Sequence, residues 1–212
     1  MEQASAGADL LNFSTLTTSV TVDLTSITAL ATMVHRMIVG ETSSQEANFE
    51  NVYGGSANDT LLGNSTNNLL MGNGGSDALA GGDGNDEIYG GTGRNILIGG
   101  LGGDYLAGGS DQDLILSDKY NSETVPLALQ SMLVEWVQTT PYQTRIDHLP
   151  GNTPGGLNGS FKRTPTTVTV DSSSDYLGGG GGQDWFIANS TLDVITDRAV
   201  DEVFTQIDTW TL

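Results

Sequence analysis

Seven oxygen-bearing side chains recur at nine-residue intervals in the middle of this sequence. They are Asp59, Asn68, Asp77, Asp86, Asn95, Asp104 and Asp113. Carboxylate and amide oxygens are the side-chain ligands of hard divalent cations such as Ca²⁺, which takes about six to eight oxygens. The chain has no Cys and only 2 His. A thiolate site is therefore excluded, and the spacing points to cation binding by oxygen.

These side chains belong to seven contiguous nonapeptides that run from Gly54 to Leu116. Position one is always Gly, position six is Asp or Asn, and position eight is Leu or Ile. Gly permits the positive φ of a tight turn, and an aliphatic residue in an alternating strand faces inward. We predict a turn of six residues and a strand of three in each repeat. Two repeats, 18 residues, would form one coil, and stacked coils would form two parallel sheets.

An 18-residue coil places alternate repeats on the same edge of the stack. Asp59, Asp77, Asn95 and Asp113 then share a first edge, and Asn68, Asp86 and Asp104 share a second edge. The gaps Asp59–Asp77 and Asp86–Asp104 bring two carboxylates together and are predicted to bind most strongly, because affinity rises with ligand charge. Asn95 is predicted to be the weak position, with the charge of Arg94 beside it. Asp and Asn are also good turn residues, but this alone does not fix them at position six.

The pattern closely resembles the signature GGxGxDxUx of the repeats-in-toxin (RTX), or haemolysin-type, calcium-binding family. The resemblance covers residues 54 to 116. It implies an all-β fold, a calcium-binding parallel β-roll (β-solenoid), with several Ca²⁺ ions held between coils by the seven position-six residues and by loop carbonyls. Family members commonly leave the cell by type I secretion, so the resemblance implies an extracellular or cell-surface location. Extracellular calcium modules bind at about 10⁻⁴ to 10⁻³ M, so folding is expected after export.

The flanking segments are expected to extend and cover the roll. We divide the chain into N-terminal β-rungs or cap (1–53), the seven repeats (54–116), a helical insertion and loop (117–169), and resumed rungs with a C-terminal cap (170–212). Leu16, Val20, Val22 and Leu24 alternate with polar residues, which predicts a strand. Asp9 and Leu11 fit positions six and eight of a degenerate repeat. Residues 27–38 mix helical and strand patterns and stay unassigned.

Helical spacing appears after the repeats. Leu129, Met132, Leu133, Trp136 and Val137 predict an amphipathic helix that starts near Pro126. Thr140 and Pro141 predict the cap and first position of a second, short helix.

We expect the first helix, or else a partner protein, to cover outward-facing side chains too apolar for solvent. These are Ile96, Ile98, Leu114 and Leu116. Asp175 with Leu177, and Asp184 with Phe186, then restore positions six and eight. The run from Trp136 through this region also resembles C-terminal segments that follow such repeats in large bacterial secreted or surface proteins.

The net charge argues against binding to nucleic acid or anionic lipid, and the absence of catalytic motifs argues against an enzyme. The 26 acidic residues against 7 basic ones give a net charge of −19, which repels nucleic acid and anionic lipid. No apolar run approaches the roughly 18 residues of a membrane span, and the start lacks the features of a cleaved signal peptide. HExxH, GxSxG and GK[ST] are absent, and the two histidines are solitary. Four further acids could suggest a catalytic carboxylate pair, but a solvated acidic face is the commoner arrangement, and we predict that face: Asp193, Asp197, Asp201 and Glu202.

The sequence therefore predicts a non-catalytic module of a larger protein. It would fold on binding extracellular Ca²⁺ and support secretion, folding or surface attachment, with a protein or cell-surface partner left open. The alternative is an adhesin-type or ice-binding solenoid without catalytic activity. An outward column of Thr60, Ala78, Ile96 and Leu114 is too irregular for ice binding.

Overall fold

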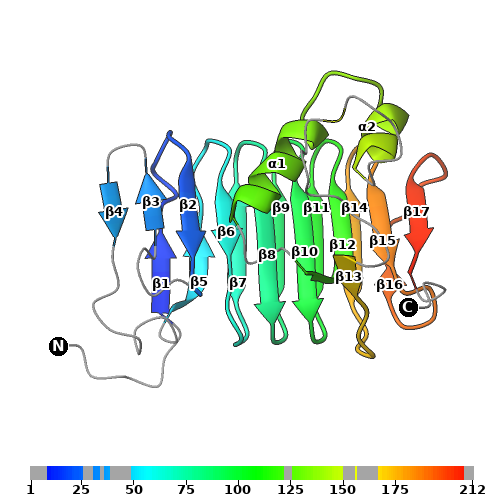
Figure 1. Ribbon diagram of the computed structural model, residues 1–212, viewed down its shortest axis with the longest axis horizontal. Helices are drawn as coiled ribbons and strands as arrows, with labels where there is room; N and C mark the ends of the chain where they lie inside the picture. Colours follow the sequence, from blue (N-terminus) through cyan, green and yellow to red (C-terminus); the bar gives the residue numbers. More distant parts are fainter. Residues whose placement is uncertain are drawn as a thin grey trace.

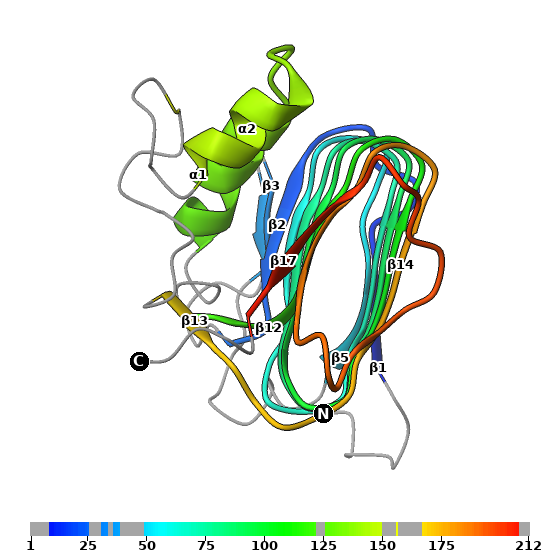
Figure 2. The ribbon, with the colours of Figure 1, turned by 90° about the vertical axis from the view of Figure 1, so that its right-hand side faces the viewer.

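Two parallel sheets face each other across a narrow apolar core and form a flattened β-roll, with two helices on one side (Figures 1 and 2). The computed structural model describes residues 9–25, 31–33, 36–38, 49–121, 126–149, 156 and 167–207. We call the sheet beneath the helices the covered sheet and the opposite one the open sheet. The parallel β-roll expected from the sequence is confirmed.

The strand order follows the coils from one end of the roll to the other. The open sheet contains β1 (Asp9–Asn12), β5 (Phe49–Tyr53), β7 (Leu69–Asn73), β9 (Glu87–Gly91), β11 (Tyr105–Gly109), β14 (Tyr176–Gly180) and β16 (Val194–Ile195). The covered sheet contains β17 (Val203–Gln206), β15 (Trp185–Ala188), β12 (Leu114–Tyr120), β10 (Ile96–Leu101), β8 (Ala78–Asp83), β6 (Thr60–Leu62), β2 (Val20–Asp23), β3 (Ala31–Met33) and β4 (Arg36–Ile38). A short β13 (Val168–Thr169) pairs antiparallel with β12.

The strand register confirms the 18-residue coil. Leu79 pairs with Leu61 on one side and with Leu97 on the other, so position-eight side chains stack in one column. All seven position-eight residues of the repeats are buried in the core between the sheets. Strand β6 has the predicted three residues, but the other strands of the repeats are longer, and β8 and β10 each have six. The glycines at positions one and two continue the ladder, as Gly82 and Gly100 pair directly, because without Cβ atoms their backbones can approach.

The coils begin before the repeats, as predicted. Val22 pairs with Leu61 and Leu11 pairs with Val52, which places both upstream residues in the position-eight column. The alternation in β2 is confirmed by its burial pattern, although Leu16 lies in the preceding turn. Part of the unassigned segment 27–38 forms β3 and β4: β3 pairs antiparallel with β2, and β4 pairs antiparallel with β3.

The coil pattern resumes after a long detour. Leu106 pairs with Leu177 and Ile115 with Phe186, 71 residues apart instead of 18, so 53 residues separate two adjacent coils. The detour contains α1 (Pro126–Trp136) and α2 (Tyr142–His148). Pro141 occupies the N-cap of α2 and makes no side-chain capping bond, so the prediction of Thr140 as cap was wrong by one residue. Among the described residues, no helix is long and apolar enough to span a membrane.

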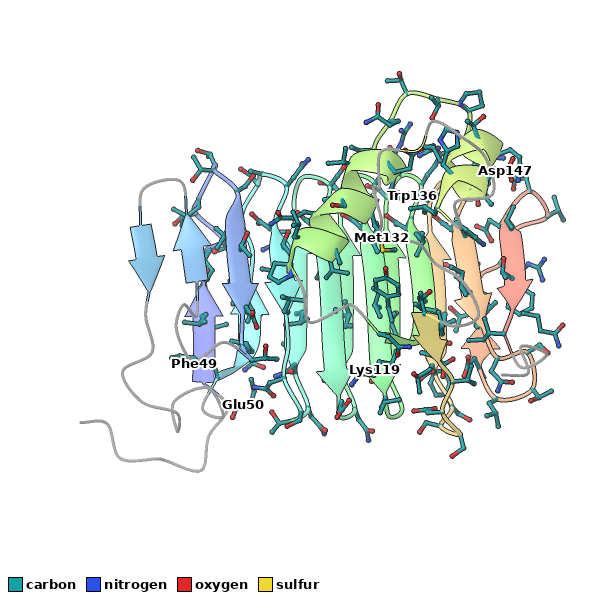
Figure 3. The ribbon with its side chains drawn as sticks, viewed as in Figure 1. Phe49, Glu50, Lys119, Met132, Trp136 and Asp147 are labelled. Carbon is teal, nitrogen blue, oxygen red and sulfur yellow. The ribbon has the colours of Figure 1, made fainter. Side chains whose placement is uncertain are left out.

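Helix α1 lies on the covered sheet, which confirms the predicted docking site. Ile96, Ile98, Leu114 and Leu116 form one buried cluster with the apolar residues of α1. Figure 3 shows Met132 and Trp136 on the face of α1 that is turned toward the sheet. The fully buried Trp136 ring lies 6.2 Å from the Trp185 ring, and its Nε1 donates to the carbonyl oxygen of Gln112 at 2.9 Å. The helix thereby gives the molecule a second core outside the roll.

Candidate metal sites

The position-six side chains form two ladders along the edges of the roll, as the coil register requires. On the first edge, the backbone N of Asp59 donates to Asp77 Oδ1 at 2.7 Å, and the bonds continue through Asn95 to Asp113. On the second edge, Asn68 N donates to Asp86 Oδ1 and Asp86 N donates to Asp104 Oδ1. All seven predicted residues are buried in these ladders. In all of them except Asn68, one side-chain oxygen is therefore fixed by the coil before it.

The second carboxylate oxygen has no partner in most of the ladder. The Oδ2 atoms of Asp77, Asp86, Asp104 and Asp113 are buried and make no hydrogen bond within the protein. In Asp59 the Oδ2 accepts from Gly55 N at 2.6 Å. Buried charged oxygens without a partner are strongly unfavourable. The ladder therefore contains the orphan oxygens that a hard cation would satisfy.

The invariant glycine at position one leaves room for these oxygens. A Cβ added to Gly72 would lie 2.4 Å from Asp77 Oδ2 and 2.6 Å from the carbonyl oxygen of Gly90 in the next coil. Gly81 is similarly placed against Asp86 Oδ2 and the carbonyl of Gly99. Carboxylate and carbonyl oxygens therefore gather beside these two glycines. Within the described ranges no three Asp, Glu or His side chains group as metal ligands, so loop carbonyls must complete any coordination shell.

Burial raises the pKa of the position-six carboxyl groups well above the ordinary value. The pKa rises to about 7 for Asp86, about 8 for Asp77 and Asp104, and about 9 for Asp113. Desolvation is the largest cause, partly opposed by the backbone N–H that each group accepts. Neighbouring carboxylates raise it further, as Asp59 does for Asp77 and Asp184 does for Asp113. A bound cation would favour the ionised form instead.

Asn95, predicted to be the weak position, differs from its acidic neighbours because its side chain carries a hydrogen-bond donor. Its Nδ2 donates to the carbonyls of Gly93 and Gly108, at 3.0 and 3.4 Å. The amide thus occupies carbonyl oxygens that a carboxylate would leave available for a cation. In Asn68, Oδ1 accepts a hydrogen bond from the backbone N of Asn64, and Nδ2 donates to the carbonyl oxygen of Glu50. The Nη1 of Arg94 donates to the carbonyl oxygen of Gln138 at 2.8 Å.

Two acids predicted to belong to a solvated face take position six in the last coils. Asp193 continues the second-edge ladder, whereas the Glu202 carboxylate accepts from the backbone N of Ala199. Asp193 Oδ1 accepts from Asp175 N at 3.2 Å, and Glu202, only 6 % exposed, lies eighteen residues after Asp184. The interpretation of Glu202 as solvated was therefore wrong, whereas Asp197 and Asp201 are exposed. Nine-residue spacing from Asp184 was the signal that could have identified both. It is hard to see because glycine is missing from these last units.

Comparison with known proteins agrees with this geometry. The RTX calcium-binding nonapeptide repeat (4 copies) matches residues 53–88 and 80–115. The central segment is therefore made of RTX repeats, a structural calcium-binding unit that forms β-rolls. No match was found among curated proteins. Residues 53–115 therefore belong to the class of RTX calcium-binding repeats, within a parallel β-roll.

Acid is expected to replace calcium partially as a stabiliser of the roll. The folded-state pKa values exceed the unfolded value near 3.9, so the folded state holds more protons between about pH 4 and 9. Stability without calcium should then fall as pH rises through this window, by about 1.4 kcal/mol per pKa unit for each carboxyl. In chelator, far-UV circular dichroism should show more β signal at pH 5 than at pH 8. An equal or larger β signal at pH 8 would contradict the assignment.

Proposed function

We propose that this chain is a non-catalytic module of a larger secreted or surface protein, which folds when it binds several calcium ions outside the cell. The module would support secretion, folding or surface attachment of the parent protein. Its parts would be the N-terminal rungs (1–53), the repeats (54–116), the helical insertion (117–169), and the resumed rungs with their cap (170–212). Calcium ions would be its partners, together with a protein or cell-surface partner.

The orphaned, buried Oδ2 atoms are the observation that supports this proposal most directly. Asp77, Asp86, Asp104 and Asp113 each present such an oxygen, and bound calcium supplies the positive charge that it lacks. Asp59 completes the gap with Asp77, while Asn68 and Asn95 contribute amide side chains and weaker positions. At ten times Kd each filled site contributes about 1.4 kcal/mol, so several sites together approach the stability of a whole domain. Calcium concentration would then decide whether the roll folds.

Calcium titration at pH 8, followed by far-UV circular dichroism, tests the proposal. The β signal should be largely absent in chelator and should rise between about 10⁻⁴ and 10⁻³ M calcium. Magnesium should not replace calcium, because it is smaller and loses its water reluctantly. Asp86→Asn should move the midpoint to higher calcium, while Asp147→Asn on α2 should leave it unchanged. A full β signal in chelator would refute calcium-dependent folding.

An adhesin-type solenoid is the second candidate, and the open sheet favours it. Its outer surface exposes Tyr105 and Tyr176, 45 % and 52 % accessible, and the Tyr89 ring lies 5.7 Å from that of Tyr105. The irregular column of the covered sheet, which includes Ile96 and Leu114, is buried beneath α1 and so cannot bind ice. The exposed column of the open sheet is equally irregular, and it consists of Leu69, Glu87, Tyr105 and Tyr176. Calcium-loaded protein that binds cell-surface glycans, and loses this in Tyr105→Ala, would favour adhesion. Unchanged binding in that variant would count against it.

A further inference from the structure

The roll continues beyond the segment matched by the RTX repeats. After the detour, β14 to β17 pair in register with the preceding coils. Four units of nine residues cover residues 170–205, and their position-eight side chains are Leu177, Phe186, Ile195 and Phe204. Leu177 and Phe186 are buried in the core of the roll, and Ile195 and Phe204 pack against it. The same inward column therefore runs through both sections.

Position six is acidic in all four of these units. The residues are Asp175, Asp184, Asp193 and Glu202. Asp104 N donates to Asp175 Oδ1 and Asp113 N donates to Asp184 Oδ1, both at 2.7 Å. These bonds repeat the ladder geometry of the RTX segment, although 71 residues separate the partners. From Asp104 on the second edge and from Asp113 on the first edge, each gap between successive coils therefore contains two carboxylates. The earlier gaps that include Asn68 or Asn95 contain only one.

Orphan oxygens converge where the two sections meet. Asp113 Oδ2 and Asp184 Oδ2 are both buried without a hydrogen-bond partner. A Cβ at Gly108 would lie 2.3 Å from Asp113 Oδ2 and 2.8 Å from the carbonyl oxygen of Gly179. Gly179 belongs to the resumed section, so oxygens from both sides of the detour gather in one gap. Gly180 and Gly182 also have the positive φ of the corresponding glycines in the repeats.

We infer that residues 170–205 form a second calcium-binding section, whose first sites combine Asp113 with Asp184 and Asp104 with Asp175 across the 53-residue detour. This inference rests on the proposed calcium-dependent function and extends it to residues outside the RTX match. Asp193 and Glu202 supply the acidic groups of the next gaps. A cation between Asp113 and Asp184 links the coil before the 53-residue detour to the coil after it. It therefore holds the two ends of the insertion together as well as the two coils.

The helical insertion contacts this first-edge site directly. The Tyr142 hydroxyl donates to the carbonyl oxygen of Asp184 at 2.6 Å, and Trp136 Nε1 donates to the carbonyl of Gln112, next to Asp113. Arg145, buried beside the Trp136 ring, donates to the carbonyl of Trp136 and to the Gln112 side chain. Docking of α1 and α2 is therefore coupled to the geometry of this gap. Trp185, directly after Asp184, reports on its occupancy.

Terbium provides a local probe, because Tb³⁺ takes the oxygen ligands of calcium and emits when a nearby tryptophan is excited. The number of calcium ions bound is measured in parallel by calorimetry. Wild-type protein should give tryptophan-sensitised terbium emission that calcium displaces. Asp184→Asn should remove at least half of the emission and lower the calcium count by at least one. Asp86→Asn, on the other edge within the RTX segment, should lower the count but keep most of the emission.

The outcomes separate the two proposals. If Asp86→Asn lowers the calcium count while Asp184→Asn leaves count and emission unchanged, the second section is refuted and the proposed function survives. If wild-type protein binds no calcium, both are refuted. Should Asp184→Asn lack the β signal in saturating calcium, Glu202→Gln in the final coil takes its place under the same criterion. Unchanged count and emission in Glu202→Gln then overturn the inference.

Discussion

Replacing Trp136 by alanine is expected to lower the free energy of unfolding of the calcium-loaded protein by about 3–5 kcal/mol. The Trp136 side chain is fully buried between α1 and the covered sheet, and it packs against Trp185 and Tyr142. Its loss leaves a cavity, removes the hydrogen bond to the Gln112 carbonyl, and takes away the ring beneath the Arg145 guanidinium, 4.8 Å from its centroid. Urea unfolding in saturating calcium measures the effect.

Leu127→Ala is the matched control for this experiment. Leu127 lies on the same helix but is 61 % exposed, so its truncation should change stability by less than about 0.5 kcal/mol. Loosening of α1 in Trp136→Ala should also uncover Ile96 and Leu114, and sedimentation would detect self-association through that surface. If Trp136→Ala changes neither stability nor oligomeric state, the docking contact has no energetic importance.

The period of nine made most of the roll predictable. A fixed Leu or Ile at position eight and a fixed acid or amide at position six determine which side chains face the core and which face a neighbouring coil. This is why the register of Leu61, Leu79 and Leu97 followed from spacing alone. The need for a cover over Ile96 and Leu114 followed from composition, and α1 was one of the two covers expected, beside a partner protein. The register and the need for a cover both depend on which side chains are buried, and the spacing of apolar residues in a sequence predicts burial well.

Features that depend on backbone approach or on atom-level partners were not predictable. Strands reach six residues because the glycine backbones of successive coils pair, which residue types alone do not reveal. The Asn95 amide donates to the carbonyl oxygen of Gly108, whereas the residue type alone shows only that a charge is missing there. Glu202 was misjudged because the acids around it resemble a solvated face. Only the coil register, continued across the detour, shows that it is buried.

Gly75→Ala is expected to destabilise the roll by at least about 2 kcal/mol even in saturating calcium. Gly75 has φ +103°, and an added Cβ would lie 2.5 Å from the carbonyl carbon of Ala57 in the preceding coil. The neighbouring Gly74 is the matched control, since its Cβ would meet nothing closer than 3.4 Å and its φ is not positive. Gly74→Ala should therefore change stability by less than about 1 kcal/mol. Because calcium binding needs adjacent coils in register, Gly75→Ala should also raise the calcium midpoint seen by circular dichroism, and equal midpoints for the two variants would show that coil spacing does not control the site.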